Sequence, residues 1–177
     1  IGGPGAKPYD LKVSFKPINP DGAPNVYRRS VYTFWKRTGP TPVMMALDAS
    51  KRDVCTVRRE RTDSASQALI MLNGTQFVET ARATADLLIQ NHGTTNPNDL
   101  IQEAFKKLTS RSPSERESKI LQNLLEEQKK YFTDDKETEK FLKVGYYQAK
   151  AKDKKYLAAV TSLVSTLMNF DGTLSKR

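Results

Sequence analysis

The second half of the chain repeats apolar residues at intervals of three and four positions, which is the period of an amphipathic α-helix. The repeat begins near residue 64 and predicts helices over residues 64–73, 75–90, 97–108, 113–132 and 153–168. A sixth, shorter helix is expected near residues 135–144, ahead of Gly145. The pattern therefore predicts an all-α fold, a helical bundle of about five to six helices.

Capping residues mark the ends of the predicted helices. Asp63 or Ser64 is predicted to cap the first helix and Asn73 to stand at its stop signal. The stretch Ser112–Glu115 has the spacing of a capping box for the fourth helix. The predicted inward side chains are Ala65, Ala68, Leu69, Leu72, Phe77, Val78, Ala81, Ala85, Leu88, Leu100, Ile101, Ala104, Phe105, Leu108, Ile120, Leu121, Leu124, Leu125, Tyr131, Phe132, Leu157, Val160, Leu163, Val164 and Leu167.

The N-terminal third has a different pattern, rich in proline and glycine. Seven of the nine prolines lie before residue 43, and only the stretch "LKVSFKP" at 11–17 alternates as one edge strand would. We expect an extended arm over residues 1–26, followed by a single α-helical domain over residues 27–177. Because the chain begins at Ile1 with no leader sequence, the arm is expected to be the remnant of a longer protein.

The composition restricts the kinds of partner and site that the chain can have. The formal charge is +9 and the pI is about 9.6, which suits a polyanionic partner. A single cysteine, Cys55, excludes an intrachain disulfide and a cysteine metal cluster, and is expected to be a small buried side chain. The apolar run "YLAAVTSLVSTLMNF" is shorter than the roughly 20 residues needed to cross a bilayer, so no transmembrane segment is predicted.

The basic excess is concentrated between residues 27 and 61, where nine Lys or Arg face three acids. Aromatic residues interleave with these cations in "VYRRSVYTFWKRT", as they do on surfaces that bind phosphates and stack bases. The same aromatic spacing also fits one face of a short helix packed on the core, and this second interpretation is favoured. The candidate anion-binding or docking residues are Arg28, Arg29, Lys36, Arg37, Arg58, Arg59 and Arg61, with Tyr27 and Trp35.

Arg58, Arg59 and Arg61 directly precede the first predicted helix, and two roles remain open for them. Together with the helix N-terminus they could hold a phosphate, sulfate or carboxylate. Alternatively they pair with nearby acids or carbonyls and tie the proline-rich third to the bundle, the favoured interpretation. The candidate acidic partners are Asp48, Asp53 and Glu60.

Catalytic signatures are absent from the sequence. His92 is the only histidine and is expected to be exposed in a loop, so a histidine triad or metal site is disfavoured. No phosphate-binding loop, dinucleotide-binding fingerprint or haem-attachment motif occurs. The pairs Glu126-Glu127 and Asp134-Asp135 are interpreted as solvated charge. We therefore assign no catalytic residue, no metal and no cofactor to this chain.

The segment "YRRSVYTFWKRTGPTPVMMALDASKRDVCTVRRERTDSASQALIMLNGTQFVETAR" resembles a known family. It is similar to the C-terminal domain of unknown function of planctomycete proteins that often carry a cytochrome c domain upstream, a PSD-type domain. The family pattern maps onto Tyr27, Arg28, Arg29, Trp35, Lys36, Arg37, Asp48, Arg58, Arg59, Arg61, Thr62, Gln67 and Asn73. The resemblance implies an extracytoplasmic protein whose haem, if present, belongs to an upstream region.

Three functional hypotheses follow. The favoured one is a non-catalytic helical module whose arginine-rich face docks against upstream domains of the same polypeptide or a protein partner. The second is a module that binds sulfated or acidic polysaccharide, with nucleic acid disfavoured for an exported protein. The third is part of an enzyme site that upstream domains complete.

Overall fold

The computed structural model describes residues 4–7, 19–36, 41–50, 55–58, 62, 64–93 and 96–174. The chain divides into two compact units, Ile1–Ile70 and Met71–Arg177, which are described in turn. The expected division into an arm of residues 1–26 and a domain of residues 27–177 stays a prediction.

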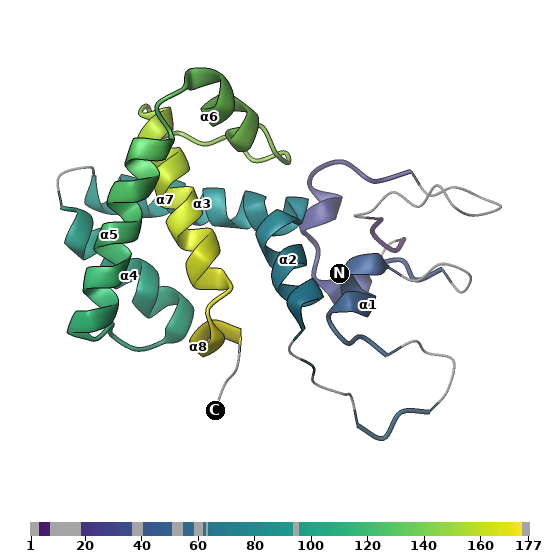
Figure 1. The fold of residues 1–177 in the computed structure, drawn as a ribbon. Coiled ribbons are helices and arrows are strands. Elements are labelled where there is room, and N and C mark those ends of the chain that lie inside the picture. The colour runs from purple at the N-terminus through teal and green to yellow at the C-terminus, as the bar shows by residue number, and fades with distance from the viewer. Residues whose placement is uncertain are drawn as a thin grey trace. The chain divides into compact units, whose positions relative to one another are not determined.

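The all-α fold class is confirmed (Figure 1). The described residues hold no strand, and Ala6 and Thr33 form an isolated parallel bridge. The α-helices are α1 (Pro42–Ala46), α2 (Ala65–Asn73), α3 (Thr75–His92), α4 (Pro97–Thr109), α5 (Glu115–Tyr131), α6 (Asp135–Leu142), α7 (Lys154–Met168) and α8 (Asp171–Leu174). All six predicted helices are present, and α1 and α8, of five and four residues, are too short to leave a periodic signal.

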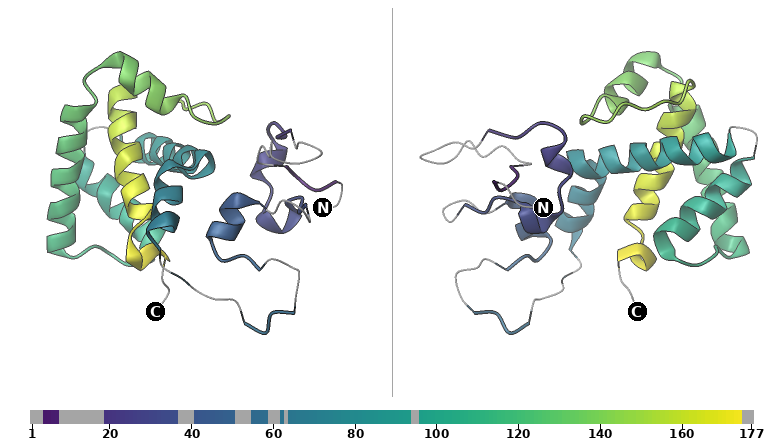
Figure 2. Two further views of the ribbon diagram at one scale, coloured as in Figure 1. Left: turned by 45° about the vertical axis from the view of Figure 1, so that its right-hand side comes forward. Right: turned by 180° about the vertical axis from the view of Figure 1, so that it is seen from behind.

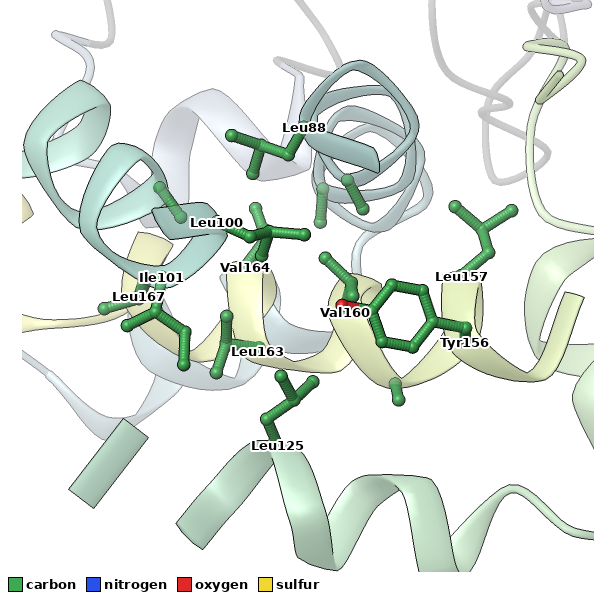
Figure 3. Packing of buried hydrophobic residues seen from close by; sticks show 14 of the residues in the cluster. Leu88, Leu100, Ile101, Leu125, Tyr156, Leu157, Val160, Leu163, Val164 and Leu167 are labelled. Carbon is green, nitrogen blue, oxygen red and sulfur yellow. The ribbon is translucent and has the colours of Figure 1, made fainter. Parts of the chain in front are cut away.

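Helix α7 is the centre of the C-terminal unit. It contacts α3, α4, α5, α6 and α8, and Figure 2 shows α5 running beside it while α3 crosses it steeply. Apolar side chains from three other helices surround it: Leu88 of α3, Leu100 of α4 and Leu125 of α5 point toward Val164 and Leu163 (Figure 3). Nine of its residues are buried, so it is a core helix on nearly all sides.

Both α3 and α7 contain small residues that are fully buried. Ala81 and Ala85 on α3 and Ala158 and Ala159 on α7 have no exposed surface at all. Side chains of this size let two helix backbones approach closely. No helix among the described residues is long and apolar enough to span a membrane.

Side-chain caps fix the helix starts in this unit. Asp153 caps α7 by accepting a hydrogen bond from the Tyr156 amide at 3.0 Å. The capping box of α5 is formed by Ser114 and Glu117, so its predicted placement at Ser112–Glu115 is wrong by two residues. The box forms at Ser114 because its hydroxyl accepts a hydrogen bond from the Glu117 amide. The Glu117 carboxylate in turn accepts one from the Ser114 amide at 2.8 Å.

Several predicted core positions are exposed. No residue of α2 is buried, and its Leu69 and Leu72 are 60% and 40% exposed. On α5, Ile120 and Tyr131 are more than half exposed, because only a narrow stripe with Leu121 and Leu125 faces α7. Helical periodicity marks the apolar side of a helix, but the neighbouring helices decide how much of that side is covered.

The N-terminal unit contains little regular structure in its described part. Two 3₁₀ helices, Asn25–Tyr27 and Ser30–Tyr32, replace the single short helix favoured for this stretch, so that prediction is wrong. The chain instead pairs with the Gly5-Ala6 segment, since the Ala6 amide donates to Tyr32 O at 2.8 Å and the Phe34 amide to Ala6 O at 2.7 Å. The predicted strand at 11–17 lies outside the described residues.

The Leu163→Ala substitution tests the centre of this core. Leu163 has no exposed surface, so its truncation should lower the free energy of unfolding by about 2–5 kcal/mol through lost burial and a residual cavity. Leu87→Ala on α3, where the side chain is 53% exposed, is the control and should cost far less. Urea denaturation measures both, and equal losses would show that α7 does not organise the core.

Candidate functional site

The structure describes part of the predicted basic cluster. Arg28, Arg29, Lys36, Arg58, Tyr27 and Trp35 belong to the described residues, as does Asp48. Arg37, Arg59, Arg61, Asp53 and Glu60 lie outside them, so their predicted roles stay predictions.

Arg28 acts as a tie within the N-terminal unit. Its Nη1 donates a hydrogen bond to the Pro4 carbonyl at 2.9 Å, and its guanidinium lies 4.8 Å from the centre of the Tyr32 ring. The first contact binds the segment after the first 3₁₀ helix to the start of the chain, and the second joins it to the second 3₁₀ helix. A guanidinium stacked on an aromatic face and bonded to a carbonyl is a structural group in this position.

The other described cations of the cluster differ from one another in exposure. Lys36 is half-buried next to the half-buried Trp35, whereas Arg29 and Arg58 are exposed. Tyr27 is 54% exposed. The described cluster is therefore divided between groups that hold the unit together and groups that face solvent.

Asp48 is the centre of a polar network that joins α1 to α2. Its backbone has a positive φ of 58°, which aspartate tolerates better than most residues. Its carboxylate accepts hydrogen bonds from the Thr62 amide at 2.7 Å, the Thr62 hydroxyl at 2.8 Å and Gln67 Nε2 at 3.1 Å. Gln67 also forms a reciprocal cap with Ser64, which confirms Ser64 as a capping residue of α2.

A second polar cluster was not predicted from the sequence. Glu79, Arg82 and Asp86 lie on one face of α3 and are 6%, 4% and 0% exposed. They hold the segment between α6 and α7, residues 145–152, which we call the strap. The sequence did contain a sign of their burial, because each of these three residues directly follows a predicted core position on α3.

Glu79 and Arg82 bind the start of the strap. The Glu79 carboxylate accepts hydrogen bonds from the amides of Tyr146, at 2.7 Å, and Tyr147, while Arg82 Nη2 donates to the Tyr147 carbonyl at 2.7 Å. Gly145 turns the chain with a φ of 80° and lies so close to Glu79 that a Cβ would stand 2.3 Å from its carboxylate oxygen. Glycine is required there for both reasons.

Asp86 binds the end of the strap. Its carboxylate accepts hydrogen bonds from the Lys150 amide at 3.0 Å, the Ala151 amide at 2.8 Å, the Tyr147 hydroxyl at 2.7 Å and Gln90 Nε2 at 2.9 Å. Burial raises the pKa of Asp86, but these donors outweigh it and the net pKa lies below the usual value. A carboxylate saturated in this way is a structural anchor rather than a general base.

Among the groups that donate to Asp86, the Tyr147 hydroxyl is the one that can lose its proton. Burial raises the pKa of its hydroxyl to about 12, and the hydrogen bond to the Asp86 carboxylate adds to the effect. The raised pKa stabilises the fold below about pH 10, and this contribution is lost as the pH rises toward 12. Tyr147 is therefore neutral and donating at physiological pH.

His92 is not exposed in a loop, so that prediction is wrong. It is the last residue of α3, its side chain is 25% exposed, and its Nε2 contacts the Glu103 carboxylate of α4. Lys107 Nζ lies 2.6 Å from the same carboxylate. The hydrogen bonds from Lys107 and His92 lower the pKa of Glu103 to about 2. The histidine thus joins two helices.

Cys55 is exposed, which corrects the expectation of a buried thiol. Across the described ranges, no group of three or more His, Cys, Asp or Glu side chains is placed to hold a metal ion.

We expect Tyr147→Phe to lower the free energy of unfolding by about 1.5–3 kcal/mol, the typical value of a hydrogen bond to a charged group. Tyr131→Phe removes a hydroxyl from a side chain that is 64% exposed and should change stability little. Denaturant titration of the two variants checks the difference. If they are equally stable, the hydrogen bond from the Tyr147 hydroxyl to Asp86 does not stabilise the fold.

Glu103→Gln should destabilise the protein at neutral pH and much less in acid. The folded pKa of Glu103 lies below its ordinary value of 4.5, so its ion pairs stabilise the fold above pH 4.5 and are lost as the pH falls toward 2. Melting temperatures between pH 7 and pH 3 measure the change, with Glu127→Gln on α5 as control. A difference from wild type that is independent of pH would contradict this assignment.

The family relationship is visible in sequence rather than in known structures. No curated protein and no solved structure matches this chain. The family model of PSD1, described as a protein of unknown function (DUF1553), matches residues 1–125, which include the basic cluster, the Asp48 network and most of α5. This chain therefore belongs to the PSD1 family of proteins of unknown function (DUF1553).

Proposed function

We propose that the chain is a non-catalytic interaction module that docks on a protein partner through its N-terminal unit. One observation supports the proposal: within a single stretch of eight residues, Tyr27, Val31 and Phe34 are 54%, 71% and 39% exposed. Large apolar side chains grouped on a surface mark sites where another protein binds.

The stretch is fixed in place before any partner binds. The hydrogen bonds of Ala6 with Tyr32 and Phe34 hold its second half, and Arg28 holds its first half to Pro4. A segment that is already ordered loses less conformational freedom on binding. The exposed apolar side chains on this ordered backbone therefore support the proposal that the stretch is a recognition surface.

The charge around this stretch suits an interface. Arg29 is exposed within it, and Arg58 is exposed elsewhere in the same unit. Aromatic residues and arginine are enriched at the energetic centres of protein interfaces. The favoured partner is consequently a protein surface with apolar pockets and some acidic groups.

The resemblance to the planctomycete family suggests which partner this surface binds. The first partner to test is an upstream domain of the same polypeptide, in an extracytoplasmic, cytochrome c-associated protein. Any haem would lie in that upstream domain.

A photo-cross-linking residue at Val31 of the full-length protein, in its native cells, tests the proposal. We expect one defined product, which mass spectrometry would map to a partner protein or an upstream domain. Phe34→Ser should lower its yield severalfold by removing part of the apolar surface. The same cross-linker at the exposed Gln102 of α4 is the control and should give no such product.

Equal cross-linking from both positions would contradict docking through the N-terminal unit. A polyanion module would give a different result: selective binding of heparin or an oligonucleotide, with a steep dependence on salt. In that case the double variant Arg29→Ala/Arg58→Ala would lose binding while its melting temperature stayed the same.

A further inference from the structure

Helix α5 carries two neighbouring rows of apolar side chains, and the C-terminal unit covers one of them. Leu121 and Leu125 are buried and belong to the core around α7. The second row lies one residue earlier, about 100° around the helix. In this row Ile120 and Tyr131 are 56% and 64% exposed, and Leu124 is half-buried. The apolar surface of α5 is therefore wider than the surface that α7 covers.

The contacts of α5 show which side of it stays open. Its inward face packs on α7, and α4 lies along one flank, where Gln122 Nε2 donates a hydrogen bond to Asn98 Oδ1 at 2.7 Å. Ile120 is two residues from Gln122, a rotation of about 200°, so the second row lies on the opposite flank. In the left view of Figure 2, α5 is the outermost helix of the C-terminal unit.

Two charged residues belong to the same flank. Arg116, Ile120, Leu124, Glu127 and Tyr131 follow one another at intervals of four, four, three and four residues, which places them on one side of the helix. We call these five residues the outer row. Arg116 and Glu127 are exposed, and neither makes a hydrogen bond or an ion pair within the part of the chain that the structure describes. The outer row thus has a cation and an acid on either side of two apolar residues.

We propose that the outer row binds a second copy of this chain, with the two α5 helices antiparallel. A two-fold axis halfway between Arg116 and Glu127 places Arg116 of each copy opposite Glu127 of the other. Ile120 and Leu124 of both copies then lie around the axis, between two identical ion pairs. The same surface is used on both sides, as in an isologous interface.

The order of the charges favours this partner and this direction. A parallel pair of helices would place each charge opposite its own kind, which is unfavourable. A partner with charge of one sign, such as a nucleic acid, would leave either Arg116 or Glu127 without an opposite charge. A second copy supplies both signs with the same separation, about 16 Å along the helix axis.

The interface is small, so the association should be weak. The outer row spans about 22 Å of helix, and interfaces below about 1,200 Å² are typical of transient complexes. We expect a Kd on the order of 100 µM. The dilute chain is monomeric, and in that state Glu127→Gln serves as the stability control described above. The outer row belongs to the C-terminal unit, so this inference does not depend on the N-terminal docking stretch.

Two charge reversals test the pairing. Arg116→Glu and Glu127→Arg each place like charges opposite one another at both ion pairs, so either variant alone should self-associate at least about tenfold more weakly. An equimolar mixture of the two variants should associate like wild type, because both ion pairs are restored between unlike copies. Sedimentation equilibrium of the whole chain from about 5 to 500 µM brackets the expected Kd and measures each case.

Variants outside the outer row are the controls. Lys106→Glu on α4 and Glu126→Arg on a different side of α5 make the same charge changes at exposed positions and should associate like wild type. Ile120→Ser should weaken association severalfold while its melting temperature in dilute solution stays the same, since Ile120 is 56% exposed.

A chain that stays monomeric over this range would overturn the proposal and leave the outer row to a different protein. So would a mixture of the two charge reversals that associates no better than its components. Loss of association by Phe34→Ser but not by Ile120→Ser would also overturn it, because self-association would then use the N-terminal unit.

Discussion

Asp86 has no exposed surface, and its ionised carboxylate can exist there because four hydrogen-bond donors converge on it. Three of those donors come from the strap, so the anchor and the strap stabilise each other. Removal of the strap would leave buried charge on α3, and removal of the charge would leave strap amides without acceptors. The α6–α7 connection is therefore part of the core.

This polar anchoring complements the apolar packing of α7. Leu163, Val164 and their neighbours give the C-terminal unit its burial, a non-directional force that does not select one path for an irregular segment. Directional bonds from Glu79, Arg82 and Asp86 select that path. The unit thus combines an apolar centre with one polar face that sets the course of its longest ordered connection.

The N-terminal unit is held together almost entirely by such directional polar bonds. Its described part has short helices and isolated bridges but no strand, and side chains such as Arg28 and Asp48 supply the bonds that regular structure would otherwise provide. A chain held at separate points can leave Tyr27, Val31 and Phe34 exposed on a fixed backbone. The docking surface proposed for this unit follows from this arrangement, because an irregular segment is held by hydrogen bonds and presents exposed apolar side chains.

The sequence alone determined the all-α class, the six longer helices and the basic stretch, because periodicity and charge are properties of neighbouring residues. It named Asp48 only as a candidate partner of the arginines, which stays a prediction, and its hydrogen bonds with Thr62 and Gln67 became known only from the structure. The tertiary structure decided the burial of Glu79, Arg82 and Asp86, the pairing of His92 with Glu103, and the exposure of Leu69. Each depends on which segment, distant in sequence, covers a given helix face, and no local pattern of residues specifies that partner.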